Sequence, residues 1–177
     1  MSGDDRECVL LRWGLVPSWS NDGKDVAINA RSETVAGKPA FRAAFRKRRC
    51  LVLADGYYEW KAEGKAKRPF FFHRRDGQPL AFAGLWESWH GPDGPAEACA
   101  ILTTDANKLT HPVQNRMPVI LTPETGAVWI DPDVSDPEAL QALLKPFPPD
   151  ETAFHEVSRL VNNPKNNRAE LILPIAG

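Results

Sequence analysis

Residues 41–60 read FRAAFRKRRCLVLADGYYEW, and this stretch decides the class of fold that the sequence predicts. Its first two phenylalanines stand four residues apart and share one face of a helix, which we expect over residues 39–45 with a proline in the first turn. Residues 50–54 form a short β-favourable run that ends at Asp55-Gly56, and residues 57–61 resume as a strand. The stretch therefore predicts a helix followed by two strands that meet at an Asp-Gly hairpin turn.

The same hairpin pattern returns downstream, where residues 69–74 and 80–86 flank Asp76-Gly77. Two further strands are expected over residues 98–103 and 118–121. Many strands in a chain with few helices indicate the α+β class with a mainly antiparallel sheet.

Two further elements are predicted nearer the two ends of the chain. A strand over residues 9–11 leads into the turn-rich residues 13–19. A helix begins at Asp136-Pro137, because aspartate caps a helix and proline fits its first turn. Leu140, Leu143 and Leu144 supply the apolar stripe of that helix.

The chain has 177 residues, 42% of them hydrophobic, which is enough to bury one sizeable core. No repeat, low-complexity stretch or linker is visible, so we expect a single domain over residues 1–177. The longest apolar runs are far shorter than the roughly 20 residues of a membrane span, and residues 1–7 do not resemble a secretory signal. Three widely spaced cysteines form neither a disulfide framework nor a CxxC pattern. These features predict a cytoplasmic protein without a membrane partner.

A formal net charge of −1 gives no general attraction to polyanions. Basic residues nevertheless form two clusters along the chain. The first comprises Arg42, Arg46, Lys47, Arg48 and Arg49, and the second Lys61, Lys65, Lys67, Arg68, Arg74 and Arg75. Solvated surface faces are the commoner interpretation of such runs, and nucleic-acid binding is the alternative.

Polar residues in segments that otherwise look buried mark a candidate site. Asn29 and Arg31 fall on the same side of an extended segment, although a turn asparagine and a surface arginine are the simpler interpretation. Glu59 lies between two aromatic residues. A carboxylate in apolar surroundings has a raised pKa, which suits it to proton transfer near neutral pH, and an outward-facing partner of a lysine is the equal alternative.

A third polar group flanks the last two predicted strands. It comprises Thr103, Thr104, Gln114, Asn115 and Arg116. Its arginine can grip a phosphate with two hydrogen bonds, and its hydroxyls and amides can hydrogen-bond sugar or phosphate. The aromatic residues Trp13, Trp19, Tyr57 and Trp60 could stack on unpaired bases, with core packing as the alternative for each.

The four histidines, His73, His90, His111 and His155, show no metal-ligand spacing, and the sequence has no HExxH or paired-cysteine motif. Glycine-rich phosphate loops of the Walker and Rossmann types are absent as well. We therefore expect neither a metal nor a cofactor.

Seven segments, in this order, resemble the SOS-response-associated peptidase (SRAP) domain family, whose members process abasic sites. They are RWGLVPSW (12–19), INARSET (28–34), FRAAFRKRRCLVLADGYYEW (41–60), PLAFAGLWE (79–87), ILTT (101–104), RMPVIL (116–121) and VSRLVNNPKNN (157–167). The resemblance covers nearly the whole chain. It implies the SRAP fold, in which the sheet is barrel-like and a few helices are peripheral.

The resemblance also implies a chemistry. In this family an N-terminal cysteine reacts through its amine and thiol with the open-chain aldehyde of an abasic site in single-stranded DNA, and a thiazolidine crosslink results. The residues that match catalytic positions are Asn29 of the INAR motif, Glu59 of the DGxxEW motif, and Gln114 at the position of the family's histidine. The glutamate assists proton transfers and is linked to removal of the initiator methionine. The residues that match DNA-binding positions are Trp19, Arg31, Thr103 and Arg116.

The sequence departs from the family pattern at two places. The family begins Met-Cys-Gly-Arg and runs through a further stretch before the RWGL-type motif, whereas this sequence starts Met1-Ser2-Gly3-Asp4 just ahead of it. Gln114 can hydrogen-bond but cannot exchange protons as an imidazole does, and His111 would replace it only with a rearranged backbone. Cys8 is not terminal, and Ser2 offers only a hydroxyl. We therefore expect impaired crosslinking for the sequence as given. Either Met1 is an internal codon, so that the natural protein has the missing segment, or the gene has lost that segment.

Three functions stay open. The first is processing of abasic sites in single-stranded DNA, and the second is non-catalytic binding of single strands. The third, a plain protease, is the weakest because no nucleophile beside a base is readable. The first two predict a monomer whose partner is single-stranded DNA, in the cytoplasm and associated with the nucleoid when bound to DNA.

Overall fold

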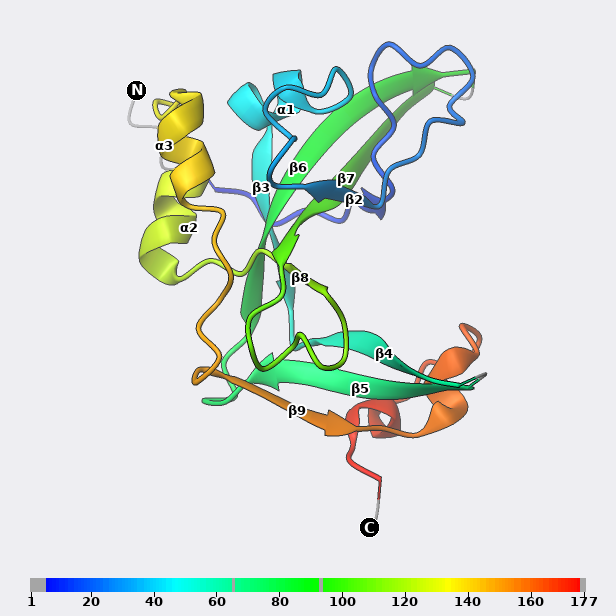
Figure 1. The fold of residues 1–177 in the computed structure, drawn as a ribbon. Helices are drawn as coiled ribbons and strands as arrows, with labels where there is room; N and C mark the ends of the chain where they lie inside the picture. The colour runs from blue at the N-terminus through cyan, green and yellow to red at the C-terminus, as the bar shows by residue number, and fades with distance from the viewer. Residues whose placement is uncertain (1–5, 65, 93, 176–177) are drawn as a thin grey trace.

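The computed structural model describes residues 6–64, 66–92 and 94–175, which form an α+β fold of two β-sheets and short helices (Figure 1). The larger sheet is curled into a half-barrel, with the strand order β1-β7-β6-β3, and β2 and β8 pair with further parts of β7. Its strands are β1 (Arg12–Trp13), β2 (Asn29–Arg31), β3 (Arg49–Ala54), β6 (Leu80–Gly91), β7 (Gly94–Asp105) and β8 (Arg116–Pro118). The predicted fold class is confirmed.

The long hairpin of β6 and β7 is the centre of the larger sheet. β3 and β8 pair antiparallel to β6 and β7 respectively, whereas β1 and β2 run parallel to β7. Beyond Gly84 and Ile101 the hairpin opens, and residues 118–121 fill the gap between its strands. The Val119 amide donates to Leu102 of β7, while the Val119 carbonyl accepts from Ala83 of β6. The strand predicted over residues 118–121 is therefore a bridging segment, of which β8 includes only Pro118.

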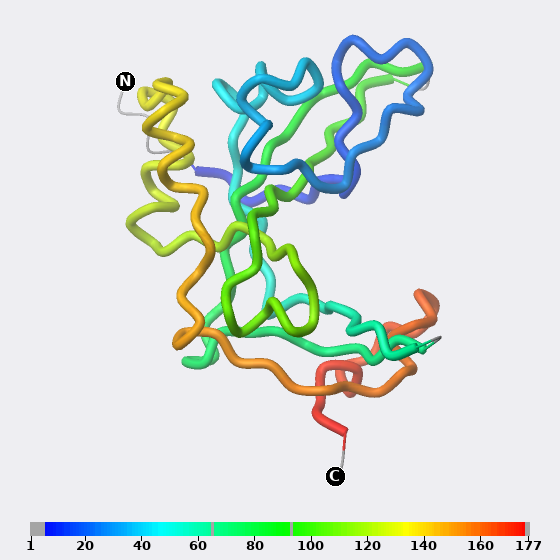
Figure 2. Tube along the Cα trace, in the orientation of Figure 1, coloured from blue at the N-terminus to red at the C-terminus, as the bar shows by residue number. Residues whose placement is uncertain are grey.

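The second sheet consists of β4 (Tyr57–Glu63), β5 (Ala66–Arg74) and β9 (Thr152–Glu156), all antiparallel, and lies below the larger sheet in Figure 1. The trace in Figure 2 leaves the larger sheet after β3 and returns to it after β5. The hairpins predicted at Asp55-Gly56 and Asp76-Gly77 are therefore wrong, because each Asp-Gly pair connects strands of different sheets. The true hairpins join β4 to β5 and β6 to β7, because these consecutive strands pair antiparallel within one sheet.

Short helices pack on the larger sheet. They are α1 (Arg42–Lys47), α2 (Pro123–Trp129) and α3 (Pro137–Ala142), and the 3-10 turns η1 (Arg159–Asn162) and η2 (Ala169–Ile172) follow β9. α3 begins as predicted, because the Asp136 carboxylate accepts from two backbone amides of its first turn. α1 begins three residues later than predicted, although Phe41 and Phe45 are buried. The strand predicted at residues 9–11 is wrong: the first strand begins at Arg12, and Leu10 is fully exposed because no neighbouring strand accepts it.

The main hydrophobic core lies between the larger sheet and the helices, and includes Phe45, Leu102, Val119, Trp129 and Leu140. Arg49 enters this core from the first basic cluster. Its guanidinium donates to the carbonyls of Phe45, Arg46, Trp129, Asp131 and Val134, and so ties α1 to the end of α2. Arg48 pairs with the buried Glu87 at 2.6 Å. These two arginines are interior structural residues. No helix in the described ranges is long and apolar enough to cross a membrane.

Candidate functional site

A cavity of about 530 Å³ opens between the larger sheet and β4. Its lining consists of Trp13, Asn29, Ala30, Arg31, Tyr57, Tyr58, Glu59, Phe82, Ile101, Thr103, Gln114, Arg116, Met117 and Pro118. A volume of this size suits a small ligand or one nucleotide unit. Six of the seven residues predicted for the site line it, and Trp19 does not.

Strand register explains why the larger sheet contributes so many polar side chains to one wall. Residues paired across strands point to the same side of a sheet, as do residues two apart along one strand. Asn29 pairs with Ile101 and Arg31 with Thr103, and Thr103 in turn pairs with Pro118. Arg116 stands two residues before Pro118 and therefore shares that face. The intervening Ala30 points into the core and is 2% exposed.

Glu59 faces this wall from β4, in the second sheet. Burial raises the pKa of its carboxyl group, while the nearby Gln114 side chain and the Trp60 backbone amide oppose the rise. A half-buried carboxyl group with a raised pKa can exchange a proton closer to neutral pH than an exposed one. The cavity therefore holds a carboxyl group with a raised pKa opposite an asparagine and two arginines.

Gln114 reaches Glu59 from the loop between β7 and β8, which passes between the two sheets in Figure 1. The buried Asn107 organises this loop. Its side-chain oxygen accepts from the amides of Leu109 and Thr110, and its amide nitrogen donates to the Phe147 carbonyl at 2.7 Å. These hydrogen bonds fix the start of the loop that carries Gln114.

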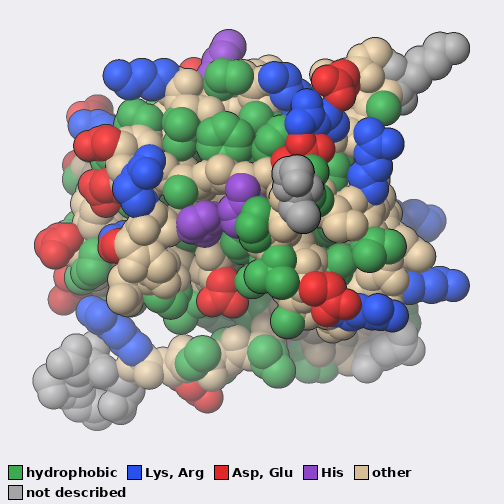
Figure 3. Space-filling view, turned by 90° about the horizontal axis from the view of Figure 1, so that it is seen from below, with side chains coloured by type: hydrophobic (Ala, Val, Ile, Leu, Met, Phe, Trp, Pro, Cys, Tyr) green, Lys and Arg blue, Asp and Glu red, His purple; other side chains and the backbone are tan. Residues whose placement is uncertain are grey.

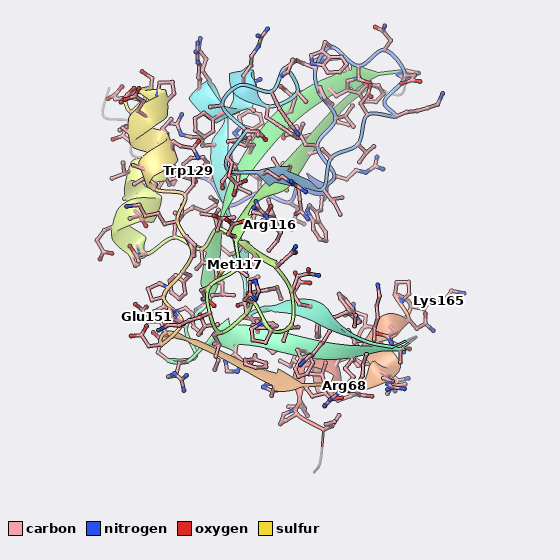
Figure 4. All side chains as sticks on the ribbon, viewed as in Figure 1. Arg68, Arg116, Met117, Trp129, Glu151 and Lys165 are labelled. Atoms are coloured by element: carbon pink, nitrogen blue, oxygen red, sulfur yellow. The ribbon has the colours of Figure 1, made fainter. Side chains whose placement is uncertain are left out.

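The two arginines of the cavity are in different states. Arg116, which Figure 4 labels in the middle of the molecule between the two sheets, donates from Nη1 and Nη2 to the two oxygens of Glu33 at 2.7 and 3.0 Å. It also donates to Asp105 at 2.9 Å and to the Thr103 carbonyl at 2.7 Å. Its hydrogen bond lowers the pKa of the Glu33 carboxyl group. Arg31, in contrast, forms no ion pair with any residue of the described ranges.

Of the four aromatic residues considered for base stacking, Trp13 and Tyr57 line the cavity, whereas Trp19 and Trp60 do not. Trp13 lines the cavity and is 57% exposed, although its ring nitrogen donates to the Ile28 carbonyl. Trp19 is 56% exposed in a turn outside the lining. Tyr57 stacks on Phe72 and packs edge-on to Phe82, so it belongs mainly to the packing between the sheets.

Other candidates lie elsewhere. His111 is exposed and outside the lining, so it does not take the place of Gln114. In the second basic cluster, Arg68 pairs with Glu156 and Arg74 with Asp76 at 2.6 Å, so both are already neutralised. Lys65, Met1 and Ser2 lie outside the described residues.

None of the three cysteines lines the cavity. Cys8 is exposed, whereas Cys50 is half-buried and Cys99 is buried. Burial raises the pKa of the Cys50 thiol to about 12, with a further contribution from Cys99, and burial also raises the pKa of Cys99. Thiols with raised pKa values are poor nucleophiles, so Cys50 and Cys99 have the character of structural residues.

Sequence reasoning missed Glu33 and Asp105, the two carboxylates that bind Arg116. A signal for both was present, because each stands two residues after a predicted site residue, Arg31 or Thr103, where alternation keeps side chains on one face.

Comparisons with known proteins agree with this geometry. The model of the SOS response associated peptidase (SRAP) family matches residues 1–164. The abasic site processing protein YoqW of Bacillus subtilis is 44% identical over 174 residues, which cover 96% of this chain and 78% of that protein. The abasic site processing protein YedK of Escherichia coli is 37% identical over 164 residues, covering 92% of this chain and 73% of that protein. A crystal structure of a protein from Bacteroides thetaiotaomicron superposes with a TM-score of 0.87 at 30% identity, covering 94% of this chain and 76% of that one.

Proposed function

The chain belongs to the SOS response associated peptidase family, and from this premise we propose that it processes abasic sites in single-stranded DNA. The relatives named above are abasic site processing proteins, which supports a DNA-damage function. The observation that carries the proposal is the cavity in which Asn29, Arg31 and Glu59 meet Thr103, Gln114 and Arg116.

The cavity residues divide into binding groups and a proton-transfer group. Arg31 has free donors for a phosphate next to the lesion, and Thr103 and Asn29 can hydrogen-bond the hydroxyls of an opened sugar. Glu59 moves protons to and from the aldehyde oxygen, with Gln114 orienting its carboxylate. An intact nucleotide carries a base that would have to leave the stack to enter, whereas an abasic nucleotide has none. The cavity therefore favours the lesion over intact DNA.

A covalent bond to the aldehyde needs a nucleophile. In the described residues no cysteine lines the cavity, and Cys50 and Cys99 have raised pKa values. These positions favour a second candidate function, recognition of single-stranded DNA without covalent capture. In that case crosslinking is impaired, and the protein acts as a non-catalytic binding relative.

A single-stranded oligonucleotide with one abasic site tests both candidates. The controls are the intact strand and a strand with a tetrahydrofuran analogue, which has the shape of the lesion but no aldehyde. We expect tighter native binding to both lesion strands than to the intact strand, and a denaturing gel then reports any covalent adduct. A band with the true abasic strand supports processing, and lesion-selective binding without a band supports the second candidate. Equal binding of all three strands without a band also supports the second candidate, which does not require a lesion, and absence of binding refutes both.

A further inference from the structure

We propose that Glu33 is an internal competitor for DNA phosphate. Its carboxylate accepts hydrogen bonds from Nη1 and Nη2 of Arg116, and a phosphate of the strand must displace it before it can bind these atoms. This inference rests on the proposed function. The two-bond geometry of Glu33 on Arg116 is the one that a guanidinium uses for a phosphate, so the two ligands exclude each other at Nη1 and Nη2.

The charge around the cavity supports competition. Glu33 and Asp105 both contact Arg116, and Glu59 lies in the lining with Arg31. Three carboxyl groups thus face two guanidinium groups. A phosphate that approached Arg116 with Glu33 in place would meet a negative cluster, which is repulsive at short range.

The position of Glu33 allows the exchange without a change in the backbone. Its neighbour Ser32 is held by hydrogen bonds from its amide to the Thr103 carbonyl and from the Gln141 side chain to its own carbonyl. The Glu33 side chain itself is 47% exposed, so it can rotate into solvent while the turn stays fixed. Only a side-chain rotation, and no refolding of the turn, separates the closed arrangement from an open one.

Arg116 itself is not fully satisfied in the closed arrangement. Its Nε is buried and has no hydrogen-bond partner among the described residues. A buried donor without a partner is costly. The pairing with Glu33 therefore does not satisfy the whole guanidinium group of Arg116.

The test measures anion binding with Glu33→Gln, which keeps the shape of the side chain and removes its charge. We expect its affinity for a fluorescent single-stranded oligothymidylate to rise about two- to fivefold, the range of one partly exposed ion pair. The salt dependence should steepen by about 0.7 in log-log slope, because one more phosphate is neutralised. In an Arg116→Gln background the same substitution should have no effect. Glu170→Gln, which removes the exposed partner of Arg168, is the matched control and should leave affinity unchanged.

A second probe separates this inference from the proposed function. Calorimetric binding of inorganic pyrophosphate should also tighten in Glu33→Gln. If neither the unmodified protein nor Glu33→Gln binds DNA, but Glu33→Gln binds pyrophosphate more tightly, the competition at Arg116 stands and the proposed DNA function fails. Unchanged or weaker binding of both probes by a folded Glu33→Gln protein overturns the competition. If this variant does not fold, Asp105→Asn replaces it, with the same expected direction and the same criterion, because Asp105 is the other, 83% exposed carboxylate on Arg116.

Discussion

At the scale of single residues, the surroundings of two carboxyl groups separate their roles. Glu59 is half-buried and has a raised pKa because of burial, whereas Glu33 has a lowered pKa because of Arg116. A proton-transfer group benefits from the first environment, and an ion-pair partner from the second. The same residue type therefore has two different electrostatic environments around this cavity.

These opposite pKa shifts predict opposite dependences of stability on pH. The stability that Glu59 contributes relative to Glu59→Gln is fully present below its unfolded pKa of about 4.3 and is lost as the pH rises through its raised folded pKa. For Glu33 the contribution relative to Glu33→Gln is present above that unfolded pKa and is lost as the pH falls through the lowered folded value. Each change should reach at most about 1 kcal/mol, because solvent screens both groups. Urea unfolding of both variants from pH 3 to 7 measures it, and curves that change in the same direction would contradict the assignment.

At the scale of elements, the segment between β3 and β4 decides where Glu59 lies. Gly56 turns the chain from the larger sheet into the second, directly before β4. A Cβ atom there would lie 2.3 Å from the Phe71 ring and 2.4 Å from the Phe72 carbonyl oxygen. The crossing thus depends on a residue without a side chain, for reasons of space rather than of hairpin geometry.

Gly56→Ala should consequently lower the free energy of unfolding by about 1–3 kcal/mol, the usual cost of forcing extra atoms into a packed site. Gly37→Ala is the matched control, because its nearest atom would be the Thr34 carbonyl oxygen at 3.9 Å. The control should differ from the unmodified protein by no more than about 0.5 kcal/mol. Denaturant titrations compare the two, and equal stability of both variants would show that the Phe71 ring yields freely.

At the scale of the whole molecule, the charge is mixed rather than concentrated. Figure 3, the view from below, shows basic and acidic side chains interspersed over that face. Arg49 donates to backbone carbonyls, Arg48 pairs with Glu87 and Arg68 pairs with Glu156. If the proposed single-stranded DNA binds at the cavity alone, it meets only Arg31 and Arg116, the two arginines of the lining.

The salt dependence of the affinity for an intact single strand measures how many cationic side chains contact its phosphates. Each neutralised phosphate contributes about −0.7 to the log-log slope, so one or two arginines predict a slope no steeper than about −1.4. Anisotropy titrations across a range of salt concentrations provide the slope, with Arg31→Gln expected to make it shallower by about 0.7. A slope near −4 would mean that the two basic clusters also bind the backbone.

The sequence by itself determined the fold class, most of the strands, the capped start of α3 and six candidate residues that line the cavity, because alternation, capping and the ordered motifs are local patterns. Alternation along residues 29–31 was enough to put Asn29 and Arg31 on one face. Only the tertiary structure decided which strands pair, since an Asp-Gly turn is locally compatible with both a hairpin and a crossing between sheets. It also decided which charges are free: Arg49 and Arg116 look alike in sequence, and the partners that occupy Arg116 come from residues 33, 103 and 105. Contacts between distant segments set burial and ion pairing, and no local pattern encodes them.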